Sequence, residues 1–121
     1  MFDWVHYIHL AEKLLQAPDE ASQRSAISRA YYAVYGVACR LKPNTNKYTG
    51  SSHKGYWDQW IHDPSPAKQK LYIDGNRLWK YRKQADYDSV GKNISRDATT
   101  AVNIAKKLLT EIQDLSRQGL F

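Results

Sequence analysis

Ser25-Ala-Ile-Ser-Arg-Ala-Tyr-Tyr-Ala-Val-Tyr35 forms the centre of a long amphipathic pattern. Arg24, Ser28, Tyr35 and Arg40 fall on the polar side of this pattern. On the other side, small or apolar residues recur every three to four positions, which is typical of one face of a helix: Ala26, Ile27, Ala30, Tyr31, Val34, Val37, Ala38 and Leu41. Small alanines between large rings let other helices approach closely. We therefore predict a helix from about residue 20 to 42 at the middle of a helical bundle.

Two further strong patterns flank this central helix. Residues 3–16 predict a first helix capped by Asp3, and Pro18 and Asp19 separate it from the central one. A last helix is predicted to start at a Ser95 cap, to carry Asp97 in its first turn and to stop at Gly119. Its apolar stripe is the cleanest in the chain: Ala98, Ala101, Val102, Ala105, Leu108, Leu109, Ile112 and Leu115.

The middle of the chain predicts two weaker helices. Residues 42–50 are rich in turn formers, and Ser51 or Ser52 is a candidate cap for a short helix. That helix would contain four ring residues, His53, Tyr56, Trp57 and Trp60. Ser65 followed by Pro66 predicts the start of another helix that reaches about Gln84. Residues 85–93 are expected to form a loop, and no strand pattern is present.

The chain has 121 residues, a length that suits one domain, and we predict a single all-α domain over residues 1–121. Its one cysteine, Cys39, is expected to be a small buried side chain. The sequence has neither a secretion signal nor a run of about 20 apolar residues, so a reducing cytoplasm is the expected location. The net charge of +6 is concentrated in residues 40–96, which hold twelve basic and five acidic residues. Such an excess favours a polyanionic partner, although a merely lysine-rich surface is an equal alternative.

Three stretches, in this order, resemble HEPN-domain proteins, and together with the Trp4 helix they cover most of the chain. They are Arg24-Ser-Ala-Ile-Ser-Arg-Ala-Tyr-Tyr-Ala33, Ser52-His-Lys-Gly55 and Leu78-Trp-Lys-Tyr-Arg-Lys-Gln-Ala-Asp-Tyr-Asp88. The resemblance implies a four- to five-helix up-and-down bundle, often a homodimer, that needs no cofactor. Many such proteins are metal-independent RNases in toxin–antitoxin, phage-defence or CRISPR-linked systems. Others are non-catalytic partners of a small nucleotidyltransferase.

The chain departs from the RNase members of that family at one position. Those members carry an Arg and, after four to six intervening residues, a His, whereas the residues at that spacing after Arg82 are Tyr87, Asp88 and Ser89. Cleavage by the 2′-hydroxyl of RNA needs an acid and a base that titrate near neutrality, and His does so most readily. Arg82 can still hold a phosphate by a bidentate contact. His53 is the candidate to replace the missing His in space, with a surface or capping histidine as the alternative.

The remaining candidates surround Arg82. Asp86 and Tyr87 form either part of a phosphate-binding or catalytic cleft or a structural ion pair with an anchoring ring. Arg29 is expected to face the same cleft, paired with Asp86 or Asp88. Core or interface positions are expected for two neighbouring rings, Tyr31 and Tyr32.

Aromatic and basic residues alternate between residues 47 and 83, a pattern that suits stacking on unpaired bases and holding phosphates. The basic candidates for RNA contact are Lys54, Arg77, Lys80 and Lys83. His6 and His9 lack further ligands nearby in sequence, so no metal site is predicted. The expected partners are tRNA or single-stranded RNA and a second copy of the chain. The alternative is a non-catalytic interaction module that docks on a nucleotidyltransferase or a larger defence complex.

Overall fold

The computed structural model describes residues 1–44, 52–91 and 93–121, and within them the fold is an all-α bundle of five helices without strands. The helices are α1 (His6–Leu15), α2 (Glu20–Leu41), α3 (Ser52–Asp58), α4 (Pro66–Tyr87) and α5 (Ile94–Arg117). The predicted all-α bundle is therefore confirmed. In this described part, the helices are too short or too polar to cross a membrane.

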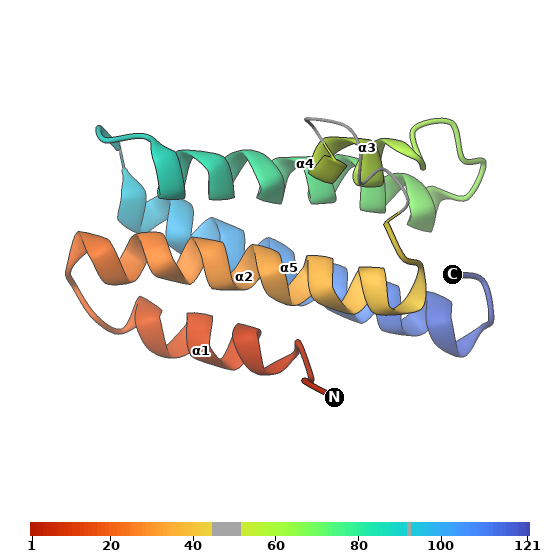
Figure 1. Cartoon of the computed structure of the whole chain (residues 1–121), viewed down its shortest axis with the longest axis horizontal. Helices are drawn as coiled ribbons and strands as arrows, with labels where there is room; N and C mark the ends of the chain where they lie inside the picture. The colour runs from red at the N-terminus through yellow and green to blue at the C-terminus, as the bar shows by residue number, and fades with distance from the viewer. Residues whose placement is uncertain (45–51, 92) are drawn as a thin grey trace.

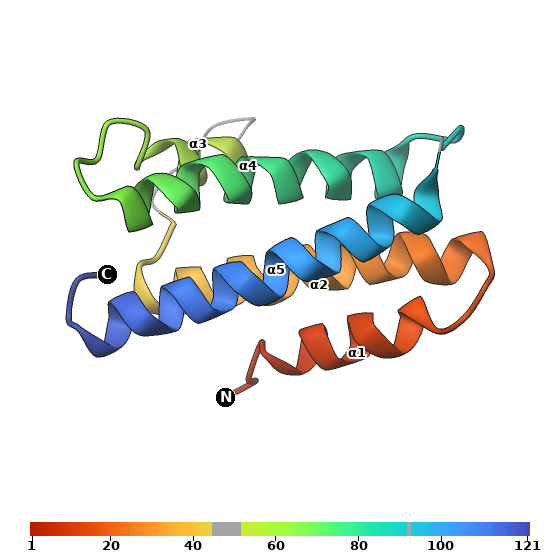
Figure 2. The same cartoon turned by 180° about the vertical axis from the view of Figure 1, so that it is seen from behind.

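The α2 helix lies at the middle of the bundle, as its amphipathic pattern predicted. It packs against α1, α4 and α5 (Figure 1). Seen from behind, α5 crosses α2, with α1 and α4 on either side (Figure 2). The short α3 packs on α4 and reaches α2 through its side chains alone. This arrangement brings side chains of α2, α3 and α4 together.

Side chains from all five helices share one hydrophobic core. Ile8 comes from α1 and Trp57 from α3, while α2, α4 and α5 supply most of the rest. The α5 stripe is buried throughout, as predicted. The largest fully buried side chains are Trp57, Tyr31, Tyr56, Ile27, Leu71, Leu78, Ile112, Val34 and Val102.

Two glycines let tryptophan rings lie directly on helix backbones. A Cβ at Gly36 would be 2.2 Å from the Trp4 ring, and a Cβ at Gly75 would be 2.2 Å from the Trp57 ring. Gly75 lowers the helix propensity of α4. Its place is explained by this close approach, since any larger side chain would displace the buried Trp57.

Several predicted helix ends are confirmed. Asp19 accepts a hydrogen bond from the Ser22 amide (2.9 Å), and Ser65 caps α4 through the Lys68 amide (3.5 Å). The chain turns after α5 at Gly119, which has a φ of 69°. The turn between α1 and α2 is stabilised by a side chain of α2. The Gln23 side-chain amide donates to the backbone carbonyls of Leu15 (3.1 Å) and Ala17 (2.6 Å).

Other predicted helix ends were wrong. The α1 helix begins at His6, because Asp3 instead accepts from the Val5 amide (3.1 Å) in a preceding turn. The α3 helix ends at Asp58, so Trp60 lies in the turn that follows. The α5 helix is preceded by Asn93 rather than by Ser95. Asn93 adopts a left-handed φ of 55° that asparagine tolerates well.

The end of α4 and the burial of two α2 residues also differ from prediction. Residues 85–87 are helical instead of belonging to a loop, so α4 ends at Tyr87. Ser28, predicted on the polar side of α2, is buried, whereas Leu41 is exposed. Of the predicted loop 42–50, only residues 42–44 are described, and the Ser51 cap, Lys47 and Tyr48 lie outside the described residues.

Candidate functional site

Side chains from α2, α3 and α4 meet in one cluster, here called the Arg82 cluster. Its members are Arg29 and Tyr32 of α2, His53 of α3, and Arg82, Asp86 and Tyr87 of α4. These six residues were all singled out from the sequence, although they are spread over nearly sixty positions. No comparison of short sequence motifs could have placed His53 beside Arg82.

Arg82 is the centre of this cluster and is mostly sheltered, with 14% of its side chain exposed. Its Nε lies 2.9 Å from Asp86 Oδ2, but the N–H bond does not point along that line, so the contact is an ion pair without an aligned hydrogen bond. Nη2 donates to the Tyr87 hydroxyl at 3.4 Å. The guanidinium carbon lies 5.2 Å from the centre of the Tyr32 ring and 5.3 Å from that of Tyr87.

The charge on Arg82 is well stabilised. Desolvation alone would lower the pKa of Arg82, but Tyr32, Asp86 and Tyr87 outweigh this and raise it. The guanidinium is therefore cationic at any physiological pH. One carboxylate neutralises it, and that carboxylate is itself partly exposed.

His53 is held by a short chain of hydrogen bonds. Trp57 Nε1 donates to the Tyr31 hydroxyl at 3.1 Å, and that hydroxyl lies 2.7 Å from His53 Nδ1. Tyr31 is fully buried, so its own proton needs an acceptor, and Nδ1 is the acceptor in contact with it. We infer that the Tyr31 hydroxyl donates to Nδ1, which leaves the proton of neutral His53 on Nε2.

Two physical effects keep His53 neutral. Partial burial lowers the pKa of His53 below its usual 6.5, and the positive charge of Arg82 lowers it further. Both side chains also lie near the Tyr32 ring, whose centre is 6.1 Å from that of the His53 ring and 5.2 Å from the Arg82 guanidinium carbon. A neutral imidazole with a proton on Nε2 is a hydrogen-bond donor toward an anion.

Arg29 lies beside the same rings as Arg82. Its guanidinium carbon is 4.8 Å from the centre of the Tyr7 ring and 5.7 Å from that of Tyr32. The expected pairing of Arg29 with Asp86 or Asp88 is not found, since the structure pairs Asp86 with Arg82. Stacking on rings takes the place of an ion pair, and among the residues that the structure describes Arg29 has no ion pair with a carboxylate.

The end of α4 is held by residues of α2 that the sequence did not single out as functional. Arg24 Nη1 donates to the backbone carbonyls of Gln84 (3.3 Å), Ala85 (2.9 Å) and Asp88 (2.6 Å). Ser28 donates to Asp86 Oδ2 at 3.2 Å, which orients the carboxylate toward Arg82. The spacing of Arg24 and Ser28, one helical turn apart, was the available signal.

Of the four basic residues predicted to contact RNA, two are engaged in ion pairs and two line a cavity. Lys54 pairs with Asp58 (2.7 Å) and Arg77 with Asp74 (3.4 Å). Lys80 and Lys83 instead line an open cavity of about 270 Å³ at the end of α4, together with Gln84, Tyr87 and Asp88. Lys83 also lies 4.3 Å from the centre of the Trp79 ring.

The His6 and His9 rings stack with centroids 6.2 Å apart on α1. Within residues 1–44, 52–91 and 93–121, the structure gathers no group of three side chains able to hold a metal ion. The Arg82 cluster combines two guanidinium groups, two phenol rings, one imidazole and one carboxylate. It is suited to binding an oxyanion.

Comparison of the chain with protein-family models, with curated proteins and with solved structures found no match.

Proposed function

We propose that this protein is a HEPN-like RNA-binding protein that holds a phosphodiester of single-stranded RNA or tRNA at the Arg82 cluster. The observation that carries the proposal is the convergence of Arg29, His53 and Arg82 from three helices around one ring, Tyr32. Two guanidinium groups and an imidazole N–H are all donors, and a phosphate offers only acceptors. The net charge of +6 brings RNA toward the surface.

Asp86 makes the proposal testable, because its carboxylate forms an ion pair with the Arg82 guanidinium when no RNA is bound. A phosphate and the Asp86 carboxylate would compete for the same guanidinium. If RNA binds there, Asp86→Asn removes the competitor and RNA binds more tightly. If the ion pair is purely structural, the substitution leaves the affinity unchanged or lowers it.

The experiment measures the affinity of a fluorescent single-stranded RNA for the wild type, Arg82→Gln and Asp86→Asn at several salt concentrations. We expect Arg82→Gln to weaken binding about tenfold, as for the loss of one charge-assisted contact, and to make the salt dependence shallower. Arg96→Gln, on an exposed residue of α5, is the matched control. Equal affinities for the wild type and Arg82→Gln, with both proteins folded by circular dichroism, would refute the proposal.

Metal-independent cleavage of the bound RNA is the catalytic form of this proposal, and it is favoured by the place of His53 and Arg82 around the same Tyr32 ring. Cleavage in the presence of EDTA, abolished by His53→Asn and by Arg82→Gln, would establish it. Because Nδ1 is engaged by Tyr31, we expect His53 to act as a donor to the phosphate and not as the base that accepts the 2′-hydroxyl proton. No cleavage of any RNA would leave binding as the function.

A non-catalytic interaction module, either a homodimer or a subunit that docks on a nucleotidyltransferase or a larger defence complex, is the second candidate. It is favoured by the neutralisation of Arg82 and by two apolar side chains just beyond it, Tyr87 (71% exposed) and Val90 (80% exposed). Such a surface would bury these side chains against a protein. Tyr87→Ser with Val90→Ser would then abolish association in sedimentation, and RNA affinity would stay low and insensitive to salt.

A further inference from the structure

A second cavity opens next to the Arg82 cluster, and we call it the aromatic slot. It has a volume of about 320 Å³ and is lined by Trp4, Tyr32, Tyr35, Gly36, Cys39 and Arg40. Tyr32 belongs to both sites, because its ring borders the slot and also lies 5.2 Å from the Arg82 guanidinium carbon. A ligand bound at Arg82 would therefore have the slot as its neighbour.

The slot is lined by Trp4 from the N-terminal segment and by two rings of α2, Tyr32 and Tyr35, which contact each other with centroids 6.5 Å apart. Trp4 lies on the backbone of Gly36 and makes its ring contacts with Phe2 and Tyr7. Tyr35 makes ring contacts on its other side, with His53 at 4.4 Å and Tyr56 at 5.5 Å. The aromatic walls are thus fixed by their own neighbours, and the space between them is pre-formed.

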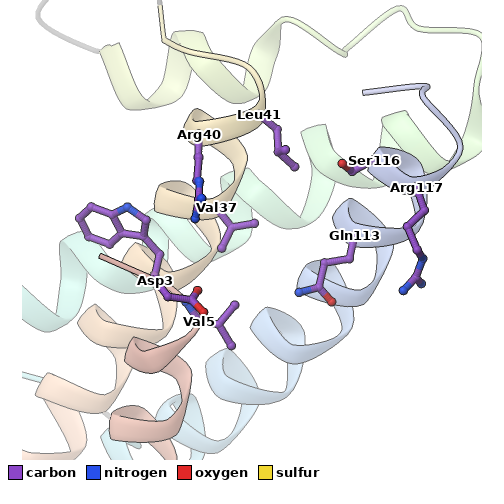
Figure 3. Close-up of a pocket in the computed structure, with 9 residues that line it drawn as sticks. Asp3, Val5, Val37, Arg40, Leu41, Gln113, Ser116 and Arg117 are labelled. Carbon is purple, nitrogen blue, oxygen red and sulfur yellow. The ribbon is translucent and has the colours of Figure 1, made fainter. Parts of the chain in front are cut away.

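Arg40 stands at the far side of the slot from Arg82. It also lines the adjoining cavity of about 570 Å³, in which Val5, Gln113 and Arg117 are further lining residues. Figure 3 shows the Arg40 side chain running along α2 toward the segment that carries Asp3, with Gln113 and Arg117 of α5 at the other side of this larger cavity. Within the described residues, Arg40 forms no ion pair, whereas Arg117 is paired with Asp114. A guanidinium that forms no ion pair with the described residues thus lies beyond the rings, in a cavity that Asp3 also lines.

We propose that the aromatic slot is a subsite for one unpaired nucleobase, flanked by phosphates at the Arg82 cluster and at Arg40. Flat rings at the walls suit stacking on a base, which tolerates any sequence because every base has a π-face. The order of cation, aromatic slot and cation is the order of phosphate, base and phosphate along a strand. This inference rests on the proposed function and names the part of the RNA that the protein reads.

Cys39 supplies a probe of the slot that leaves the wild-type protein intact. It is the one cysteine of the chain and lies in the slot wall, so alkylation reports access to the slot alone. Burial raises the pKa of the Cys39 thiol, and the reaction with iodoacetamide is therefore followed at pH 8.5 or above by mass spectrometry. Nucleoside 5′-monophosphates should slow the alkylation about tenfold at saturation, whereas inorganic phosphate and ribose 5-phosphate should not.

Two variants separate the slot from the Arg82 cluster. Gly36→Ala places a Cβ 2.2 Å from the Trp4 ring and so deforms the slot. Arg40→Gln removes the far cation from an exposed position and leaves the packing unchanged. Both should weaken the binding of intact RNA about tenfold. Gly36→Ala should not affect an abasic strand of the same length, whereas Arg40→Gln should weaken that strand as well, because it keeps its phosphates. Arg96→Gln, also exposed but on α5, is the control for charge loss.

Each outcome decides between the two proposals. If an abasic strand binds as well as RNA, and Arg82→Gln weakens both, the slot is refuted and the phosphate site stands. If no RNA binds, the phosphate site fails, and protection of Cys39 by mononucleotides still supports or refutes the slot by itself. If Cys39 becomes protected as the protein concentration rises without nucleotide, a second copy of the chain fills the slot and the base proposal is wrong.

Discussion

The imidazole of His53 shows how a single hydroxyl can determine the chemistry of a neighbouring residue. Protonation of Nδ1 would force the Tyr31 hydroxyl to accept two hydrogen bonds and would leave its own proton without a partner in a fully buried position. The neutral imidazole is thus part of the native structure.

This gives the stability of the protein a pH dependence. The folded-state pKa of His53 lies below its ordinary value of 6.5, so the unfolded chain binds the proton more readily. Stability contributed by neutral His53 is present above pH 6.5 and falls as the pH drops through 6.5 toward the lower, folded-state pKa. Urea unfolding between pH 5 and 7.5 should show this loss in the wild type.

His53→Asn should flatten that part of the profile, because the asparagine does not titrate. His62→Asn, on an exposed histidine in the turn after α3, is the control and should retain the wild-type profile. Parallel profiles for the wild type and His53→Asn would contradict the inferred proton position.

Gly75 is the residue most sensitive to a small change in size. Alanine normally stabilises an exposed helix relative to glycine by about 0.5–1 kcal/mol. Here its Cβ would lie 2.2 Å from the Trp57 ring, so we expect Gly75→Ala to destabilise the fold by about 1–3 kcal/mol. In a double-mutant cycle with Trp57→Leu, the two losses in the free energy of unfolding should not add. Additive losses would mean that the clash does not occur.

At the scale of the helices, the last turn of α4 is the element whose existence depends most on distant residues. Arg24 bonds to three carbonyls there, and helix ends otherwise leave such carbonyls without partners. We expect Arg24→Met to destabilise the protein by about 1.5–3 kcal/mol, the range for a hydrogen bond to a charged group. The amides of residues 84–88 should also exchange hydrogen faster. Arg96→Met is the control, and equal exchange in both variants would contradict this role.

The same contacts explain where sequence reasoning about the helices succeeded and where it failed. The bounds of α2 and the start of α4 follow from local caps, Asp19 and Ser65, which the sequence displays. The end of α4 was placed three residues too early because its stabilising partner, Arg24, is sixty residues away. Ser28 was placed on the wrong face for the same reason, since its partner is Asp86.

The whole molecule should unfold as one unit, because one core connects all five helices. The four tryptophans sample separate parts of it: Trp4 precedes α1, Trp57 belongs to α3, Trp60 follows it and Trp79 lies on α4. We expect tryptophan fluorescence and far-ultraviolet circular dichroism to give the same urea midpoint and slope. An earlier fluorescence transition would indicate that α3 and α4 separate first.

The candidate site was only partly predictable at this scale. The residue types of the Arg82 cluster were visible in the sequence, because ring and cation patterns are local. The aromatic slot could not be predicted from the sequence, since Trp4 and Arg40 approach each other only when the N-terminal segment folds back along α2. The neutralising contact between Arg82 and Asp86 was one of two alternatives that spacing alone could not separate.

The Gln23 side chain has a consequence for how the protein is made. Its bonds join groups only six and eight residues apart, and contacts of such short range form early. The first helical hairpin is therefore able to close on the ribosome while the rest of the chain is still being translated. Its apolar flank must then wait for α5, which is synthesised after the other described helices, and during that interval the nascent chain exposes the apolar surface that α5 later covers.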